Sequence, residues 1–121
     1  HLVGSDAGYL NVLTDGRVPR LDDEALDVAG LRQVMQHNGE AWTELLAADV
    51  DPGRMTVRHR PDGSSTRAPA SIRLAQAIHH GTDHRSQVCT ALTSLGIEPP
   101  AIDVWDWARA NGRIEDVPAA S

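Results

Sequence analysis

The feature that most constrains the fold is helical periodicity, in which apolar residues return about every 3.6 positions along two long stretches. The first stretch starts with the acids at positions 22–24, which favour the positive end of a helix, and reaches about Ala48. On an ideal helix its apolar residues fall within about one third of the circumference. This stripe consists of Leu31, Val34, Met35, Trp42, Leu45 and Leu46. A stripe of this width packs against other helices, so the sequence predicts an all-α fold.

Two more helices follow from spacing and stop signals. Residues 1–14 have apolar positions at helical intervals and are followed by Asp15-Gly16, a helix stop. The second long stretch follows Pro69 and runs to about Leu95, where Gly96 closes it. The sequence therefore predicts a helix at the start of the chain and a long helix over about 70–95.

The hairpin and the tail complete the expected organisation. Residues 55–59 alternate between apolar and polar types and precede the turn signal Pro61-Asp62-Gly63, which predicts a small exposed hairpin before the last long helix. Residues 102–108 predict a short final helix, whose Trp105 and Trp107 would cover one end of a bundle. At 121 residues and 13.0 kDa, residues 1–121 are expected to form a single domain.

Composition excludes several classes of function. Seventeen acidic residues against eleven basic ones, all Arg, give a formal charge of -6, which disfavours nucleic acid and anionic membrane as partners. No apolar run approaches the roughly 18 to 20 residues of a membrane span. The only cysteine, Cys89, has no partner for an internal disulfide, so we expect a reducing, cytoplasmic setting. The opening at His1 shows no signal peptide and resembles an internal point of a longer protein.

His80 and His84 are the strongest candidates for a chemical site. With His80 at 0° on an ideal helix, His84 lies at about 40° on the same core-facing side. Two imidazoles at this spacing can bind one ion at metal–nitrogen distances of about 2.0 to 2.1 Å. Small neighbours such as Ala77 and Gly81 leave room for an ion, although close approach of a facing helix would use them equally well.

Such a pair also arises by chance in a chain with six histidines, and two ligands hold a metal weakly. A third donor on another helix is needed, and His1 is the candidate. Asp83 and Gln87 flank the pair and are expected either to accept an imidazole N–H or to be solvated. Asn38 lies within the stripe of the second helix, where it would reach the site or find a backbone partner. Tyr9 would line the pocket or simply pack.

The segment around this pair resembles the DinB family of helical-bundle metalloproteins. The resemblance is carried by His80-Gly81-Thr82-Asp83-His84-Arg85-Ser86-Gln87, Leu92, Leu95-Gly96, Pro99-Pro100, Asp103-x-Trp105 and the opening His1-Leu2-Val3-Gly4. Members carry one His near the start of the second bundle helix and a His-x-x-x-His-Arg-x-Gln run on the last long helix. The resemblance implies a metal site formed by His1, His80 and His84.

The resemblance also implies more than the residues themselves show. It implies a four-helix-bundle DinB-like architecture, with the first helix absent from this chain and the hairpin before the last long helix, and a homodimer. Three imidazoles leave an open position on a divalent ion, with Zn or Ni as the leading candidates. The ion would bind a low-molecular-weight thiol of the mycothiol or bacillithiol type as thiolate and present it to an electrophile. Metal-dependent hydrolysis and a non-catalytic, metal-stabilised binding domain are the alternatives.

Overall fold

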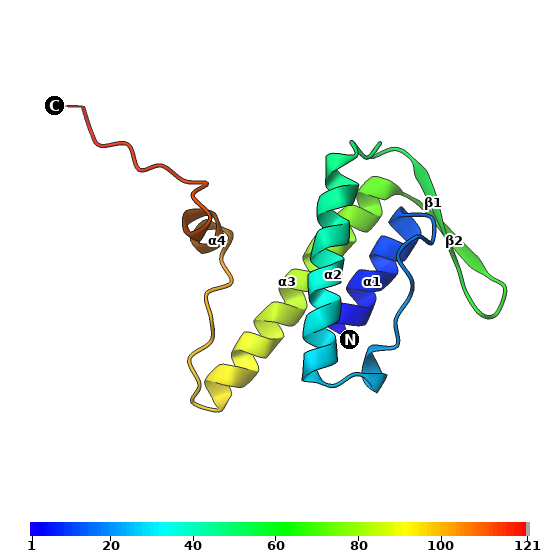
Figure 1. The fold of residues 1–121 in the computed structure, drawn as a ribbon, viewed down its shortest axis with the longest axis horizontal. Coiled ribbons are helices and arrows are strands. Elements are labelled where there is room, and N and C mark those ends of the chain that lie inside the picture. The colour runs from blue at the N-terminus through cyan, green and yellow to red at the C-terminus, as the bar shows by residue number, and fades with distance from the viewer. Residues whose placement is uncertain (121) are drawn as a thin grey trace. The chain divides into compact units, whose positions relative to one another are not determined.

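In the computed structural model, which describes residues 1–120, the chain is mostly helical with one small hairpin (Figure 1). The elements are, in order, α1 (Leu2–Leu13), the 3-10 turn η1 (Asp23–Ala25), α2 (Val28–Ala47), β1 (Met55–His59), β2 (Ser65–Pro69), α3 (Ala70–Ser94) and α4 (Val104–Ala110). The predicted helices at the start of the chain and over 70–95 are therefore present, as is the hairpin between them. No helix within residues 1–120 is long and apolar enough to cross a membrane.

The start of α2 differs from the sequence prediction. The acids at 22–24 do not open this helix but form η1, where the Asp22 side chain accepts a hydrogen bond from the Glu24 N–H at 3.2 Å. Helix α2 begins only at Val28, with Asp27 as its N-cap accepting from the Gly30 N–H at 2.8 Å. Acidic side chains cap a short turn as well as a long helix. The sequence alone therefore did not distinguish the short turn from the start of the long helix.

The hairpin pairs β1 and β2 antiparallel, with Met55 opposite Pro69 and His59 opposite Ser65. Its turn is closed by the Arg60 N–H, which donates to the Ser64 carbonyl at 2.9 Å. The Asp62 carboxylate accepts hydrogen bonds from Ser64, which lower the pKa of Asp62. This is the turn that the sequence predicts.

A buried threonine anchors the hairpin to α3. The Thr56 hydroxyl donates to the Ala68 carbonyl across the hairpin at 2.7 Å and accepts from Arg73 Nε at 2.6 Å. Arg73 Nη2 also donates to the Thr66 carbonyl at 3.0 Å. Both strands are thus tied to the first turns of α3, which fixes the Arg73 guanidinium in one orientation.

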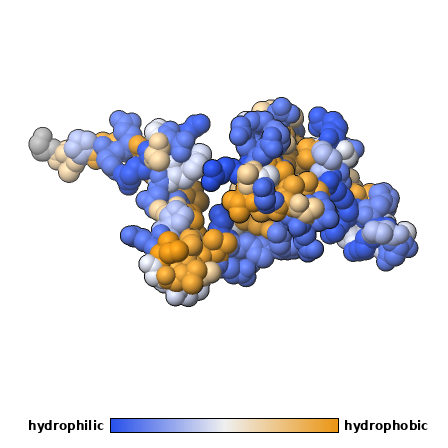
Figure 2. Space-filling view, turned by 60° about the horizontal axis from the view of Figure 1, so that its bottom comes forward, coloured by the Kyte–Doolittle hydropathy of each residue, from blue (hydrophilic) through white to orange (hydrophobic). Residues whose placement is uncertain are grey.

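The hydrophobic core lies where α1, α2 and the start of α3 meet. Leu10, Leu13, Leu45 and Ala70 form its buried cluster, with Trp42 among the partly buried side chains packed against it. Two members of the predicted stripe lie outside this core, since Met35 is 51% and Leu46 61% exposed. Figure 2 shows apolar side chains gathered into continuous areas of the surface. Only part of the α2 stripe is therefore buried within this chain.

The chain divides into two compact units, residues 1–82 and the part from Asp83 onward. The second unit contains the end of α3 and α4, whose N-cap Asp103 accepts from the Trp105 N–H at 2.7 Å. The side chains of Trp105 and Trp107 are 70% and 59% exposed. The final helix was correctly predicted, and its two indoles are exposed.

The core assignment predicts unequal costs for two leucine truncations. Leu10 is fully buried, so Leu10→Ala should lower the free energy of unfolding by about 2 to 5 kcal/mol through lost burial and a residual cavity. The matched Leu46→Ala removes the same atoms from an exposed position of α2 and should cost less than about 0.5 kcal/mol. Urea unfolding followed by circular dichroism measures both. Equal losses would contradict the core described here.

Candidate metal centre

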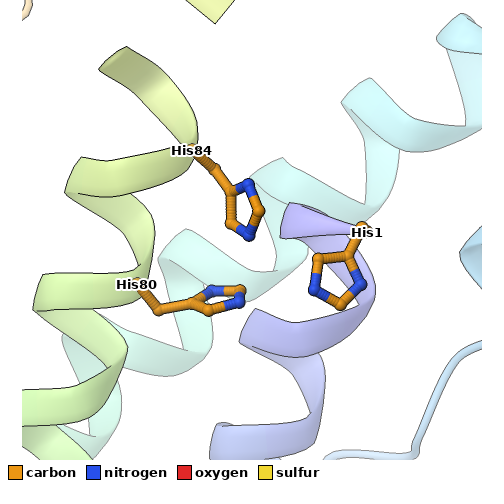
Figure 3. A group of neighbouring side chains, drawn as sticks. All are labelled: His1, His80 and His84. Atoms are coloured by element: carbon orange, nitrogen blue, oxygen red, sulfur yellow. The ribbon is translucent and has the colours of Figure 1, made fainter. Parts of the chain in front are cut away.

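Three histidines meet where the beginning of α1 lies beside the middle of α3 (Figure 3). His1 is the N-cap of α1, and its ring lies 5.3 Å from that of His80 between centroids, at an angle of 64°. His84 follows one turn later on the same continuous helix as His80. One nitrogen from each imidazole lies within 4.8 Å of the other two. His1 is exposed, whereas His80 and His84 are half-buried.

Helix α1 holds a second aromatic group against His80. The Tyr9 ring lies 5.9 Å from the His80 ring, with the two planes at 73°. This edge-to-face arrangement is the one that aromatic rings prefer. His80 is therefore bordered by His1 on one side and Tyr9 on the other, which restricts the rotation of its imidazole.

The N-terminus of α1 is also held by η1. The Asp23 carboxylate accepts a hydrogen bond from the Gly4 N–H at 2.8 Å and lies 2.9 Å from the His1 amino group. The amino group and the Gly4 N–H lower the pKa of the Asp23 carboxyl. A Cβ at Gly4 would lie 2.5 Å from Asp23 Oδ2, so glycine permits this close approach. Sequence reasoning placed Asp23 at the start of α2 and missed this contact.

His84 is oriented by a side chain one turn further along α3. Its Nδ1 lies 2.9 Å from Gln87 Oε1. Because an amide oxygen only accepts, Nδ1 carries the proton and Nε2 keeps the lone pair that a metal requires. A hydrogen bond of this kind fixes the tautomer of metal-binding histidines in proteins.

The other residues singled out from the sequence have different environments. The buried Asn38 amide donates to the Val3 carbonyl at 3.3 Å, which is the backbone partner considered for it. Asp83 is exposed, and its carboxylate makes no hydrogen bond or ion pair within residues 1–120. Of the four supporting candidates, Gln87 and Tyr9 contact a histidine of the cluster.

The donor set fits a divalent ion. Two imidazole nitrogens bound to one tetrahedral ion at about 2.1 Å lie about 3.4 Å apart, and small side-chain rotations bring nitrogens already within 4.8 Å to that spacing. Imidazole is a ligand for Zn and Ni alike. No further His, Cys, Asp or Glu of residues 1–120 joins the three histidines in this cluster. Three protein donors leave positions open for a small molecule.

A cavity of about 280 Å³ adjoins the cluster on the side of α1. His1 and Tyr9 are among its lining residues, together with three arginines that come from different parts of the chain. These are Arg20, Arg58 and Arg73. Sequence reasoning missed them, although strand alternation places Arg58 on the same face of β1 as the buried Thr56.

Comparison with known proteins identifies a family for this chain. The model of the DinB family matches residues 1–116. No curated protein and no solved structure matches the chain significantly. The family match covers the helices that carry all three histidines.

The Gln87 contact predicts the tautomer of His84. In the metal-free protein at neutral pH, the neutral imidazole should be protonated at Nδ1, and Gln87→Ala should shift it toward the Nε2–H form. Long-range ¹H–¹⁵N correlation spectra of the imidazole nitrogens measure this population. Gln76→Ala, an exposed glutamine on the same helix, is the matched control and should change nothing. An unchanged His84 spectrum in the Gln87 variant would refute the contact.

Proposed function

The chain belongs to the DinB family, and on that premise we propose that it binds one divalent metal ion through His1, His80 and His84 and transfers a small thiol to an electrophile. The observation that carries the proposal is the convergence of three imidazoles from two helices, with their nitrogens within 4.8 Å. Zn or Ni is the expected metal, because both accept nitrogen ligands of this type. The thiol would be of the low-molecular-weight class, such as mycothiol or bacillithiol.

A bound ion supplies Lewis acidity, which lowers the pKa of a coordinated thiol or water into the neutral range. The protein's own groups orient the site. Gln87 holds His84 in the tautomer that leaves Nε2 available, and Tyr9 limits the rotation of His80. Both contacts reduce the rearrangement that ligands must undergo when an ion binds.

Access for a small molecule favours a reaction over a purely structural site. Structural metal sites usually close their shell with four protein donors, whereas this cluster offers three within residues 1–120. His1 also lines a cavity of about 280 Å³, close to the lower size limit of small-molecule sites, which is about 300 Å³. Hydrolysis would use the same open position with water in place of the thiol. It is the alternative reaction that the activity experiment below distinguishes.

Metal content tests the ligand set. The protein loaded with Zn or Ni should retain about one equivalent after removal of free metal, and the double variant His80→Ala, His84→Ala should retain less than about a tenth of that. Mass spectrometry of metals measures both. The matched control replaces two exposed histidines, His37→Ala and His79→Ala, and should keep the full equivalent. Equal metal in the two double variants would end the metal proposal.

Activity tests the thiol. The metal-loaded protein should accelerate consumption of an electrophile such as a chlorinated dinitrobenzene by at least one thiol from a panel of mycothiol, bacillithiol and glutathione. Absorbance spectroscopy follows this reaction. We expect the acceleration to be lost in the His80, His84 double variant and kept in the His37, His79 control. Metal-dependent hydrolysis of an activated ester without any thiol would favour the hydrolase instead. No metal-dependent acceleration in either assay would favour a non-catalytic binding domain.

A further inference from the structure

The cavity beside the histidines has an unusual charge. Its lining includes three arginines and one aspartate, which gives these side chains a net charge of three minus one, or +2. The whole chain, by contrast, carries -6. Three of its eleven basic residues are thus gathered around one cavity of about 280 Å³. Like charges brought together in this way repel unless an anion lies among them.

Acidic side chains of residues 1–120 do not neutralise these arginines. Arg20, Arg58 and Arg73 form no ion pair within that part of the chain. The one carboxylate at the cavity, Asp23, is already engaged by the Gly4 N–H at the start of α1. The positive charge therefore stays available to a ligand.

Arg73 is held in place by two hydrogen bonds and keeps a donor for a ligand. Its Nε and Nη2 donate to Thr56 and Thr66, whereas Nη1 makes no hydrogen bond with residues 1–120. Burial of the guanidinium lowers the pKa of Arg73, and the neighbouring charge of Arg58 lowers it further. An anion between the two arginines would relieve that repulsion. The group remains charged at neutral pH in any case.

Arg58 is the more accessible partner. Its side chain is exposed and makes no hydrogen bond or ion pair with residues 1–120. It lies on β1, next to the α1 face that carries Gly8, where an added Cβ would meet nothing within 4 Å. Gly8 therefore leaves open space in the lining of the cavity that it shares with the arginines.

We propose that this cavity binds the anionic end, a carboxylate or a phosphate, of a small molecule whose other end reaches the histidine cluster. The inference rests on the proposed function and deepens it, because it names the chemical class of the substrate. His1 lines the cavity and Tyr9 borders both the cavity and His80, so a single molecule spans from the arginines to the histidines. Arg58 and Arg73 are positioned to donate charge-assisted hydrogen bonds to its oxygens.

The size and the overall charge exclude larger anions. A cavity of about 280 Å³ lies just below the smallest small-molecule sites, of about 300 Å³, so it fits one end of a small molecule. Nucleic acid and anionic membrane would meet the repulsion of a chain with net charge -6. A small anion enters the positively charged cavity without covering the acidic surface.

The binding experiment uses the metal-free protein, so that it is independent of the metal-content assay. Inorganic phosphate, succinate and neutral succinamide are titrated at low ionic strength, and the Arg73 Nε–H and Gly8 amide signals are followed by NMR. Phosphate or succinate should shift both signals saturably, and succinamide should not. Arg58→Gln should weaken binding about tenfold, the loss expected for one charge-assisted contact.

Two matched variants control for charge and for bulk. Arg67 lies on the opposite face of the hairpin, paired with Val57, so Arg67→Gln should bind like the wild type. Gly8→Leu should block the cavity without changing charge, whereas Gly39→Leu, at an open position of α2, should not. Each variant should still load metal, which separates a failed anion site from a failed metal site.

The outcomes are decisive in both directions. A shift with phosphate alone identifies a phosphate end, and a shift with succinate alone identifies a carboxylate end. Either result supports the proposal if Arg58→Gln and Gly8→Leu weaken binding of the anion and the control variants Arg67→Gln and Gly39→Leu do not. No saturable shift with either anion, or equal effects of Arg58→Gln and Arg67→Gln, would overturn the anion site while leaving the metal proposal standing.

Discussion

The packing of α1 against the beginning of α3 determines where the histidines meet. Leu10 and Ala70 both belong to the buried cluster, and α1 and α3 run antiparallel, so the start of α1 and the middle of α3 lie on the same side of it (Figure 1). Nine residues separate Leu10 from His1 and ten separate Ala70 from His80, which correspond to about 13.5 and 15 Å of helix rise. The two imidazoles therefore arrive at the same depth because the core fixes the alignment of the helices. The site depends on that core although it contains none of its residues.

Arg73 connects the hairpin to the cavity. Two of its nitrogens donate hydrogen bonds to the Thr56 hydroxyl and the Thr66 carbonyl. The guanidinium is therefore positioned by the hairpin and not by a carboxylate. The half-buried charge is acceptable because these hydrogen bonds replace part of its lost hydration. The hairpin thus serves the site in two ways, by supplying Arg58 and by orienting Arg73.

The sequence predicted what depends on local spacing. Stop signals and periodicity located α1, α3 and the hairpin, and the i, i+4 rule put His80 and His84 on one face of α3. The predicted start of α2 was wrong because acidic residues cap the short turn η1 as well as they cap a long helix. His1 was a candidate third donor that the family resemblance supported, but spacing alone could not show it close to His80, since that distance depends on packing. The arginine cavity was missed, because a linker, a strand and a helix bring its charges together.

Charge balance links the two proposals. On the proposed function, a divalent ion at the histidines would lie beside a cavity whose side chains already carry +2. The single carboxylate there, Asp23, is already counted in this net charge and accepts a hydrogen bond from the first turn of α1. A thiolate at one end and a carboxylate or phosphate at the other would place negative charge at both positive regions. Neutral substrates would leave the arginines and the ion to repel each other, so the same electrostatics that favour an anionic thiol also select against an uncharged one.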